Sequence, residues 1–521
     1  MSTAAAGSDA AAGRAALPYP SIPAVVFAIW GLVVPLVFSD RVLNADGDLL
    51  RHLRHGRWML EHGSLIHQDP FSYTRGGNPF VGFEYGSQLV YALVHQAGGL
   101  AGVAIFAGLL IAASYAVLAR FLLARGADPL LTYLVSIVAA VLGAVHWIAR
   151  PHLFTLLGVM LLLHVLEPGA RRVPAWVMLP AFALWANLHG GWVFAATLLG
   201  IYLTGAVLEW WLGGDRERWR ATATYYASAL AFGLAGTLLT PHGLELHRHI
   251  IAFFGEPFLR DNTHEFLSPD FHQAGAKMFL VVLLALIGLL AVVPGRPTWP
   301  RLLLLLANVA FTLQARRNIP LFAATVVPIL ALHFDGAWRS LPDWRGLRAV
   351  FERDARRGST AVFVACVVAP LAVLAALHGR VGGRELVYDR LDRREFPVDV
   401  VARARAQGLQ GRVFHDFIWG GYILYAWPEQ KVFIDGGTDF YGSELMRTYM
   451  DVSGIQPGWR DTLAARDIDL VLMPTSSPMA NELAHDGWRV RDCDATAALL
   501  QRDSTSSEAA GRLRSCLGTE R

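Results

Sequence analysis

The chain has 521 residues, of which 54% are hydrophobic and 17% are charged, and its formal net charge is +3. A water-soluble protein of this length carries more charge on its surface, and so small a net charge does not favour nucleic-acid binding. The apolar residues form blocks long enough to cross a bilayer core of about 30 Å, so the composition favours a polytopic α-helical membrane protein.

An Ala- and Gly-rich lead, residues 1–21, is predicted to be disordered, and eleven apolar blocks follow it in a transmembrane domain spanning residues 22–380. Because backbone polar groups cannot stay unpaired in lipid, each block is predicted to be helical. No small-residue cleavage site follows the first block, which favours a retained helix over a removed signal peptide. The blocks are 22–38, 100–119, 130–148, 152–166, 175–189, 191–212, 222–240, 278–293, 301–314, 318–334 and 361–378.

The placement of arginine orients these helices. With the N-terminus inside, arginines gather in the loops on the cytoplasmic side, as the positive-inside rule requires. An odd number of spanning helices then places the C-terminal region outside. The arginines concerned are Arg120, Arg125, Arg171, Arg172, Arg216, Arg218, Arg220, Arg296, Arg301, Arg339, Arg345, Arg348, Arg353, Arg356 and Arg357.

The first outer loop, residues 39–99, is long and contains two helical segments. Residues 85–96 are apolar but few, and they end at Gly98-Gly99. If this segment crossed the membrane, the Arg-rich loops would face outward, so we interpret it as an interfacial helix on the outer leaflet. Residues 49–61 have the spacing of an amphipathic helix suited to the headgroup layer.

An acidic pair, Asp46 and Asp48, directly precedes the amphipathic helix. Such a carboxylate can act as general base toward an attacking hydroxyl, and two carboxylates can hold a divalent cation that steadies a phosphate leaving group. The spacing also fits a helix N-cap pair, because Asp is favoured at the first turn of a helix. Both interpretations stay open on spacing alone.

Three arginines, Arg150, Arg316 and Arg317, lie at outer helix ends, the side on which the positive-inside rule depletes arginine. Each sits at a helix break close to a proline. A guanidinium can hold a phosphate by two parallel hydrogen bonds, so these residues are candidates for binding a lipid-linked phosphate. The alternative is an arginine that extends from the membrane boundary into water.

Histidines and acids gather at the same outer ends. His152, His189 and His242 can hydrogen-bond a sugar or a phosphate, or they can tie neighbouring helices together, and their spacing is not a recognised zinc pattern. An acidic side chain in a membrane-facing cavity is costly and tends to be functional. Glu84 and Glu265 are therefore further candidates for substrate binding.

Residues 381–503 differ in composition from the bundle and are predicted to form a small α/β domain. Trp419 and Tyr422 are expected to be exposed, where they could stack on a sugar ring, and Asp435-Gly-Gly437 is expected to make a turn. No chemistry is assigned to this domain. Strands are expected at 413–417, 431–434 and 469–473, and helices at 398–407, 443–451 and 479–486.

The C-terminal tail, residues 504–521, is predicted to be disordered because it is rich in Ser, Ala and Gly. Cys493 and Cys516 are predicted to be unpaired thiols. A disulfide between them is the alternative if this end lies outside the cytoplasm.

Six motifs together resemble one family. They are Asp46-Gly-Asp-Leu-Leu-Arg-His-Leu-Arg-His-Gly-Arg-Trp58, Asp69-Pro-Phe-Ser-Tyr73, Arg150-Pro-His152, Trp185-Ala-Asn-Leu-His-Gly-Gly191, Arg317-Asn-Ile-Pro320 and Trp419-Gly-Gly-Tyr422. The chain resembles the GT-C superfamily of integral membrane glycosyltransferases, which includes protein O-mannosyltransferases, lipid A aminoarabinose transferases and oligosaccharyltransferase catalytic subunits. More narrowly, it is similar to a bacterial group of GT-C-like proteins.

The resemblance implies a polyprenyl-phosphate-linked sugar donor and a bacterial cell inner membrane with the C-terminal domain in the periplasm. It implies that Asp46, in preference to Asp48, is the base, and that the donor phosphate is bound by Arg150, Arg316 and Arg317, with His152 beside them. The second outer loop, around Arg150, lacks the Asp that several relatives have there. A divalent cation, Mg²⁺ or Mn²⁺ at Asp46 and Asp48, is therefore an alternative rather than an expectation.

The sequence thus predicts an inverting glycosyltransferase that moves a hexose or a pentose to a hydroxyl of a lipid, glycan or protein at the outer membrane face. Membrane lipids are the expected surroundings and nucleic acid is not an expected partner. A transporter or lipid flippase is one alternative, but it needs polar residues through the bilayer midplane, whereas here they gather at one face. A non-catalytic membrane scaffold is the other.

Overall fold

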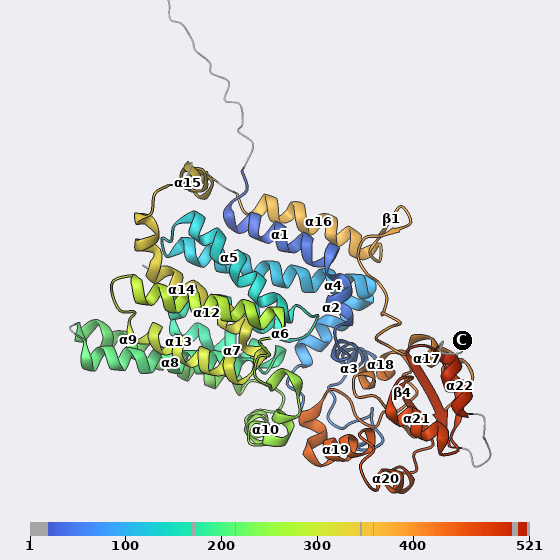
Figure 1. Ribbon diagram of the computed structural model, residues 1–521. Helices are drawn as coiled ribbons and strands as arrows, with labels where there is room; N and C mark the ends of the chain where they lie inside the picture. Colours follow the sequence, from blue (N-terminus) through green and yellow to red (C-terminus); the bar gives the residue numbers. More distant parts are fainter. Residues whose placement is uncertain are drawn as a thin grey trace, which may run out of the picture.

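The computed structural model describes residues 19–167, 172–213, 215–343, 346–357, 359–502 and 509–517. A bundle of long helices makes up most of the molecule, and a smaller mixed domain packs against one end of the bundle (Figure 1). This arrangement is the polytopic helical fold with a C-terminal α/β domain that the sequence predicts.

All eleven apolar blocks fall on helices. Among the described residues, five helices are long and apolar enough to cross a membrane, and four more apolar helices are shorter. The bundle helices are α1 (Ile22–Val37), α4 (Tyr85–Ala124), α5 (Pro129–Gly143), α6 (His152–Leu166), α7 (Met178–Leu188), α8 (Trp192–Leu212), α9 (Arg216–Thr237), α12 (Ala274–Val292), α13 (Trp299–Gln314), α14 (Ile319–Ser340) and α16 (Ala361–Ala376).

Helix α4 breaks at Gly98-Gly99, the position at which the sequence ends the interfacial segment. Gly99 has a positive φ of 62°, which favours glycine, and a Cβ on Gly98 would lie 2.9 Å from Ala375 O. The part of α4 before the break contacts the α5–α6 connection, because Tyr91 donates its hydroxyl to Arg150 O (3.0 Å). It also contacts the C-terminal domain through His95, whose Nε2 lies 2.9 Å from the Tyr425 hydroxyl.

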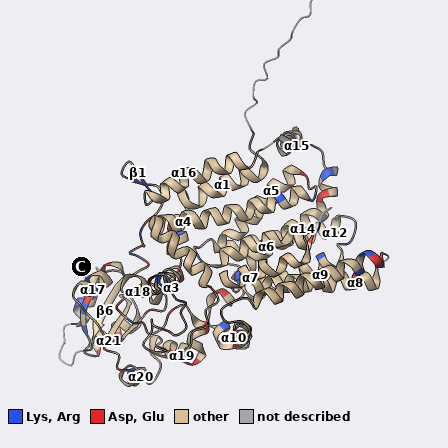
Figure 2. Cartoon of the chain, turned by 180° about the vertical axis from the view of Figure 1, so that it is seen from behind, with Lys and Arg blue, Asp and Glu red and all other residues tan. Residues whose placement is uncertain are grey.

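Charged side chains gather at the two ends of the bundle, while the helical shafts are largely uncharged (Figure 2). At the end away from the C-terminal domain, Arg301 forms a two-pronged pair with Glu167, with Nε–Oε1 and Nη2–Oε2 distances of 3.0 and 2.9 Å. At the same end, Arg339 donates to Gly126 O at 2.7 Å. Arg301 and Arg339, two of the arginines used to orient the helices, thus connect helix ends.

The C-terminal domain has one four-stranded sheet in the order β3-β4-β6-β5, in which β3 and β4 are parallel and the other neighbours are antiparallel. Its strands are β3 (Val413–His415), β4 (Leu470–Pro474), β5 (Arg489–Cys493) and β6 (Ala497–Gln501). Its helices are α17 (Val398–Ala406), α18 (Trp419–Ala426), α19 (Thr438–Ser453), α20 (Trp459–Ala465), α21 (Pro478–His485) and α22 (Ala509–Cys516). A short hairpin of β1 (Arg380–Val381) and β2 (Arg384–Glu385) joins the domain to α16.

The strand predicted at 431–434 does not join this sheet. Instead, Val432 pairs with the first outer loop: its N–H donates to Phe71 O and its carbonyl accepts from Tyr73 N–H, both at 3.1 Å. The apolar run is buried, as predicted, but its partner comes from the membrane domain. This pairing fastens the first outer loop to the C-terminal domain.

The predictions for the two chain ends need correction. Cys493 and Cys516 form a disulfide, with their Cα atoms 6.0 Å apart, rather than two free thiols. Within the predicted disordered tail, residues 509–516 form α22, which the disulfide ties to β5; residues 503–508 and 518–521 lie outside the described residues. In the predicted disordered lead, Tyr19 O accepts a hydrogen bond from Ser359 N (2.7 Å), and residues 1–18 lie outside the described residues.

Two surfaces predicted to be exposed are buried. Trp419 and Tyr422 are 4% and 3% exposed, because α18 packs against the amphipathic helix α3 (Asp48–His62). The polar face of α3 is also covered, with His52 1% and His55 2% exposed, so these side chains do not face lipid headgroups. Packing of α18 on α3 accounts for the first correction, whereas His52 is covered by Gln88 of α4 (3.3 Å) and His55 stacks on Phe71 of the first outer loop.

Candidate active site

The acidic pair lies in the connection from α2 (Ser39–Asn44) to α3, and the C-terminal domain holds this connection in place. Asp46 Oδ1 accepts a hydrogen bond from Asp48 N (3.0 Å), so Asp46 does stabilise the start of α3. The backbones of the two domains touch here: a Cβ on Gly47 would overlap Ile418 O, and a Cβ on Gly421 would overlap Gly47 O. Two glycines therefore fix the position of the acidic pair against α18.

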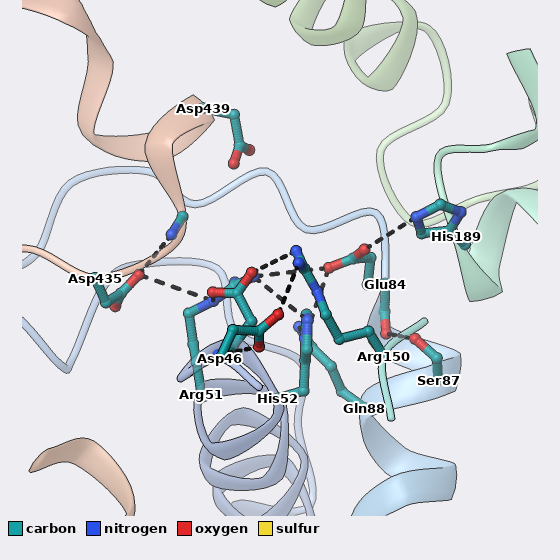
Figure 3. A network of polar contacts seen from close by, with 12 residues as sticks. Asp46, Arg51, His52, Glu84, Ser87, Gln88, Arg150, His189, Asp435 and Asp439 are labelled. Atoms are coloured by element: carbon teal, nitrogen blue, oxygen red, sulfur yellow. Dashed lines mark hydrogen bonds and ion pairs between the residues drawn. The ribbon is translucent and has the colours of Figure 1, made fainter. Parts of the chain in front are cut away.

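Arg150 joins the acidic pair from the α5–α6 connection (Figure 3). Its Nη1 donates to Asp46 Oδ2 at 3.1 Å, and its Nη2 pairs with Asp48 Oδ2. Burial alone would lower the pKa of Arg150, but the charges of Asp48 and Asp46 raise it above its usual value. Residues that are 104 positions apart thus form one buried ion-pair cluster at the end of the bundle next to the C-terminal domain.

Glu265 extends this cluster toward α13 and α14. It lies in η3 (His264–Phe266), with its Oε2 3.9 Å from Arg150 Nη1 and its Oε1 3.4 Å from Arg317 Nη1. Burial raises the pKa of Glu265, but Arg317 and Arg150 outweigh burial and lower it to about 2. His146 Nε2 lies 3.8 Å from the same carboxylate. Glu265 is therefore a fixed negative charge between two arginines.

Glu84 lies on the other side of Arg150, directly before α4. Its Oε1 is 3.8 Å from His189 Nε2, and its Oε2 is 3.6 Å from His52 Nδ1 (Figure 3). Burial raises the pKa of Glu84 to about 7, although Arg51 and Arg150 act in the opposite direction. This carboxyl therefore gains and loses its proton much closer to neutral pH than an ordinary glutamate does.

His189 holds one orientation, which its neighbours define. Its Nδ1 accepts from Gly191 N–H at 3.0 Å and lies 2.8 Å from the Thr155 hydroxyl. Because a backbone N–H can only donate, Nδ1 is the acceptor nitrogen, and in the neutral ring the proton is on Nε2. That N–H points toward Glu84, so His189 connects α7 and α8 to the cluster.

The other predicted residues lie farther out. His152 Nε2 lies 2.9 Å from His146 O, and it is the His146 ring that approaches Glu265, at 3.8 Å. His242 lies 3.1 Å from the Tyr85 hydroxyl and 3.9 Å from Glu245, away from the acidic pair, and the Arg316 side chain is exposed. The structure therefore brings Asp46, Asp48, Glu84, Arg150, His189, Glu265 and Arg317 into one network, and leaves His242 and Arg316 outside it.

Two residues of the network escaped the sequence analysis. Arg51, on α3, lies 3.8 Å from Asp48 Oδ1 and 3.9 Å from Asp435 Oδ1. Asp435 comes from the C-terminal domain, and burial raises its pKa to about 6. The i, i+3 spacing of Asp48 and Arg51 was a signal for the first, and the position of Asp435 directly after a buried apolar run was a weaker signal for the second.

Arg150 pairs with both carboxylates of the acidic pair, in the place that a metal ion would take. Among the described residues, no group of three or more His, Cys, Asp or Glu side chains is arranged to hold a metal ion. A cation at Asp46 and Asp48 would compete with Arg150 for the same oxygens. Burial and the charge of Asp48 raise the pKa of Asp46, whereas Arg150 lowers it, and the net effect is an increase.

No protein-family model matches the sequence, and no curated protein matches it. Solved structures do match the fold. The archaeal oligosaccharyltransferase AglB from Archaeoglobus fulgidus, in complex with an inhibitory peptide and a dolichol-phosphate, superposes with a TM-score of 0.53 at 12% identity, over 87% of this chain and 69% of that one. The apo form of the oligosaccharyltransferase from the same organism gives 0.52 at 12% identity, over 89% of this chain and 69% of that one.

ArnT from Cupriavidus metallidurans, bound to undecaprenyl phosphate, matches over 93% of this chain and 98% of its own, with a TM-score of 0.51 at 14% identity. At such low identity the likeness concerns the fold and not the residues of the site. The chain shares the GT-C fold of these membrane proteins, as its motifs led us to expect.

Proposed function

We propose that this protein transfers a sugar from a polyprenyl-phosphate donor to an acceptor hydroxyl at the domain-facing end of the helical bundle. The observation that carries the proposal is the contact of Arg150 with both Asp46 and Asp48. A guanidinium, a group suited to binding a phosphate, thus lies beside a carboxylate that we propose as the base. The fold supports the proposal, since two of its neighbours hold dolichol-phosphate or undecaprenyl phosphate.

In the proposed reaction, the acceptor oxygen attacks the anomeric carbon of the donor as the bond from that carbon to the phosphate oxygen breaks. Asp46 takes the proton of the acceptor hydroxyl. Arg150 and Arg317 balance the charge that develops on the departing lipid phosphate. Attack from the side opposite the phosphate inverts the anomeric configuration.

Asp46 is the better candidate for the base. Its side chain is 27% exposed, compared with 16% for Asp48, so an acceptor reaches it more easily. Its raised pKa makes it a stronger base than an ordinary carboxylate. Asp48, which pairs with Arg150 and approaches Arg51, then acts mainly by holding the two arginines.

The arginine-rich loops at the opposite end of the bundle support an outward-facing site. We propose that the membrane is a bacterial inner membrane and that the C-terminal domain lies in the periplasm. The acceptor is a hydroxyl of a lipid, glycan or protein, and the sugar is a hexose or a pentose. A lipid-linked donor in the outer leaflet would present its phosphate at the depth of Arg150.

The test is transfer of radiolabelled sugar from polyprenyl phosphate by purified protein carrying Asp46→Asn. Asparagine keeps the hydrogen bond to Asp48 N but cannot take a proton at neutral pH, so transfer should fall by at least about 10²-fold. Asp40→Asn is the matched control, because Asp40 is exposed and its contact to Asn44 Nδ2 (2.7 Å) survives the change. Full transfer by the Asp46 variant would end this assignment, and lipid that is retained without turnover by the unmodified protein would favour a scaffold.

A further inference from the structure

Arg51 is a buried arginine whose guanidinium has one long hydrogen-bond contact, from Nη2 to His52 Nε2 at 3.5 Å. The residue is 8% exposed, and its Nε has no hydrogen-bond partner. Three carboxylates surround it, but at 3.8 Å (Asp48), 4.0 Å (Glu84) and 3.9 Å (Asp435), all beyond hydrogen-bond length. A buried charged donor left without a hydrogen bond is costly, so this arrangement is complete only when other atoms enter it.

The charged partners of the Glu84 carboxylate also lie beyond hydrogen-bond length. Its carboxylate oxygens lie 3.6 Å from His52 Nδ1, 3.8 Å from His189 Nε2 and 4.0 Å from Arg51 Nη2. By contrast, Arg150 and Arg301 make close pairs with their carboxylates in the same molecule. The spacing around Arg51 and Glu84 is therefore wider than in these two close pairs, and at Arg51 it leaves a buried Nε without a hydrogen-bond partner.

A hydroxyl oxygen fits gaps of this size. An oxygen about 2.8 Å from both partners of such a pair lies about 2 Å to the side of the line that joins them. It accepts from the guanidinium and donates to the carboxylate, as a hydroxyl can and as an ammonium or a carboxylate cannot. Two neighbouring hydroxyls on a ring could in this way bridge Arg51 to Glu84 and to Asp435.

The combined charge of Arg51, Glu84 and Asp435 suits a neutral ligand. Burial raises the pKa of Glu84 to about 7 and that of Asp435 to about 6, so part of the negative charge is lost near neutral pH. Asp435 is rigidly held, because its Oδ1 accepts from Gly437 N (2.8 Å) and its Oδ2 accepts from the Tyr441 hydroxyl (3.0 Å). A fixed acceptor on one side and an arginine on the other favour a polyhydroxyl compound of defined shape.

The position of Arg51 relative to Arg150 indicates which polyhydroxyl compound would bind. Asp48 lies between the two arginines, since its Oδ2 pairs with Arg150 and its Oδ1 lies 3.8 Å from Arg51 Nε. A phosphate at Arg150 would therefore have the Arg51 group as its neighbour, as the ring of a glycosyl phosphate has its phosphate. We infer that Arg51, Glu84 and Asp435 form a subsite for the hydroxyl groups of the donor sugar, one wall of which comes from the C-terminal domain. This inference rests on the proposed function.

The test compares two classes of lipid on the full chain in nanodiscs. One is undecaprenyl phosphate, and the other is undecaprenyl phosphate carrying glucose, mannose, galactose or arabinose. The variants are Glu84→Gln and Asp435→Asn, and Asp451→Asn, an exposed acid of the same domain, is the matched control. Asparagine at 435 still accepts from Gly437 N through Oδ1, and its Nδ2 donates to the Tyr441 oxygen in place of accepting from it, so the domain should stay folded.

We expect the unmodified protein to bind one of the sugar-bearing lipids more tightly than undecaprenyl phosphate. Each of the two variants should bind that lipid about 10-fold more weakly and keep its affinity for undecaprenyl phosphate, a loss typical of one charge-assisted hydrogen bond. Equal loss for both lipids, or no loss for either, would overturn the subsite. Absence of undecaprenyl phosphate binding to the unmodified protein would instead count against the proposed function itself.

Discussion

Substitution of Gly436 by alanine tests how the C-terminal domain positions the acidic pair. A Cβ at this position would overlap Asp48 Oδ1 and lie 2.8 Å from Asp48 Cγ and 3.3 Å from Oδ2, whereas ordinary contacts begin at 3.4 Å. The Asp48 carboxyl must therefore retreat by more than about half an ångström, and Arg150, which pairs with it, must follow or lose the contact. A displacement of about 1 Å in a catalytic group typically lowers the rate by about 10²-fold.

The assay is sugar transfer by the purified variant, with thermal unfolding measured in parallel. The control is Gly200→Ala, since a Cβ there meets no atom within 4 Å and alanine is a better helix former than glycine. We expect the Gly436 variant to remain folded, to bind undecaprenyl phosphate more weakly and to lose about 10²-fold in turnover. Wild-type turnover by this variant would refute the argument that the C-terminal domain sets the position of Asp48.

Three further predictions concern stability. Burial raises the pKa of Glu84 from 4.5 to about 7, so its contribution to the free energy of unfolding is complete below pH 4.5 and is lost as the pH rises through 7, by about 3 kcal/mol at most. Glu84→Gln should flatten the corresponding fall in melting temperature. Reduction of the Cys493–Cys516 disulfide, or Cys493→Ser, should cost about 2–4 kcal/mol, and an unchanged melting temperature under reductant would argue against the bond. Arg301→Gln leaves the Glu167 carboxylate at the far end of the bundle without its arginine, with the Tyr202 hydroxyl (3.2 Å) still donating to it, and should cost on the order of 3 kcal/mol, with lipid affinity unchanged. Weaker lipid binding would mean that the two ends are coupled.

The helical bundle could be predicted from the sequence because lipid allows few backbone solutions. Each apolar block had to be a helix, and the arginine pattern assigned its ends to one side or the other. This assignment alone placed Asp46, Arg150 and Glu265 at the same end, although they are distant in the sequence. Their contacts in the structure follow from that topology.

The contribution of the C-terminal domain could not be predicted in the same way. Trp419 was expected to be exposed, and helix 49–61, which carries Arg51, was expected to lie in the headgroup layer, because helical periodicity identifies a polar or apolar face but not what covers it. The docking of α18 on α3 buries both residues, and it depends on backbone contact at Gly47 and Gly421, which no local pattern reveals. Asp435 enters the network by the same docking.

The tail shows the limit of composition as a guide. Residues 509–516 are rich in Ala and Arg and contain no apolar block, yet they form α22. The helix is held by packing on α21 and by the bond from Cys516 to Cys493, contacts made between segments that are distant in the sequence. Spacing alone gave no reason to pair these two cysteines.

A cryo-EM structure of the full chain in nanodiscs with undecaprenyl phosphate tests the central claim most directly. The account predicts density for the phosphate within hydrogen-bond distance of the Arg150 guanidinium, next to Asp46, at the end of the bundle covered by the C-terminal domain. Phosphate density at the opposite end, near Arg301, would contradict the account. So would a phosphate that lies elsewhere and leaves the contacts of Arg150 with Asp46 and Asp48 untouched.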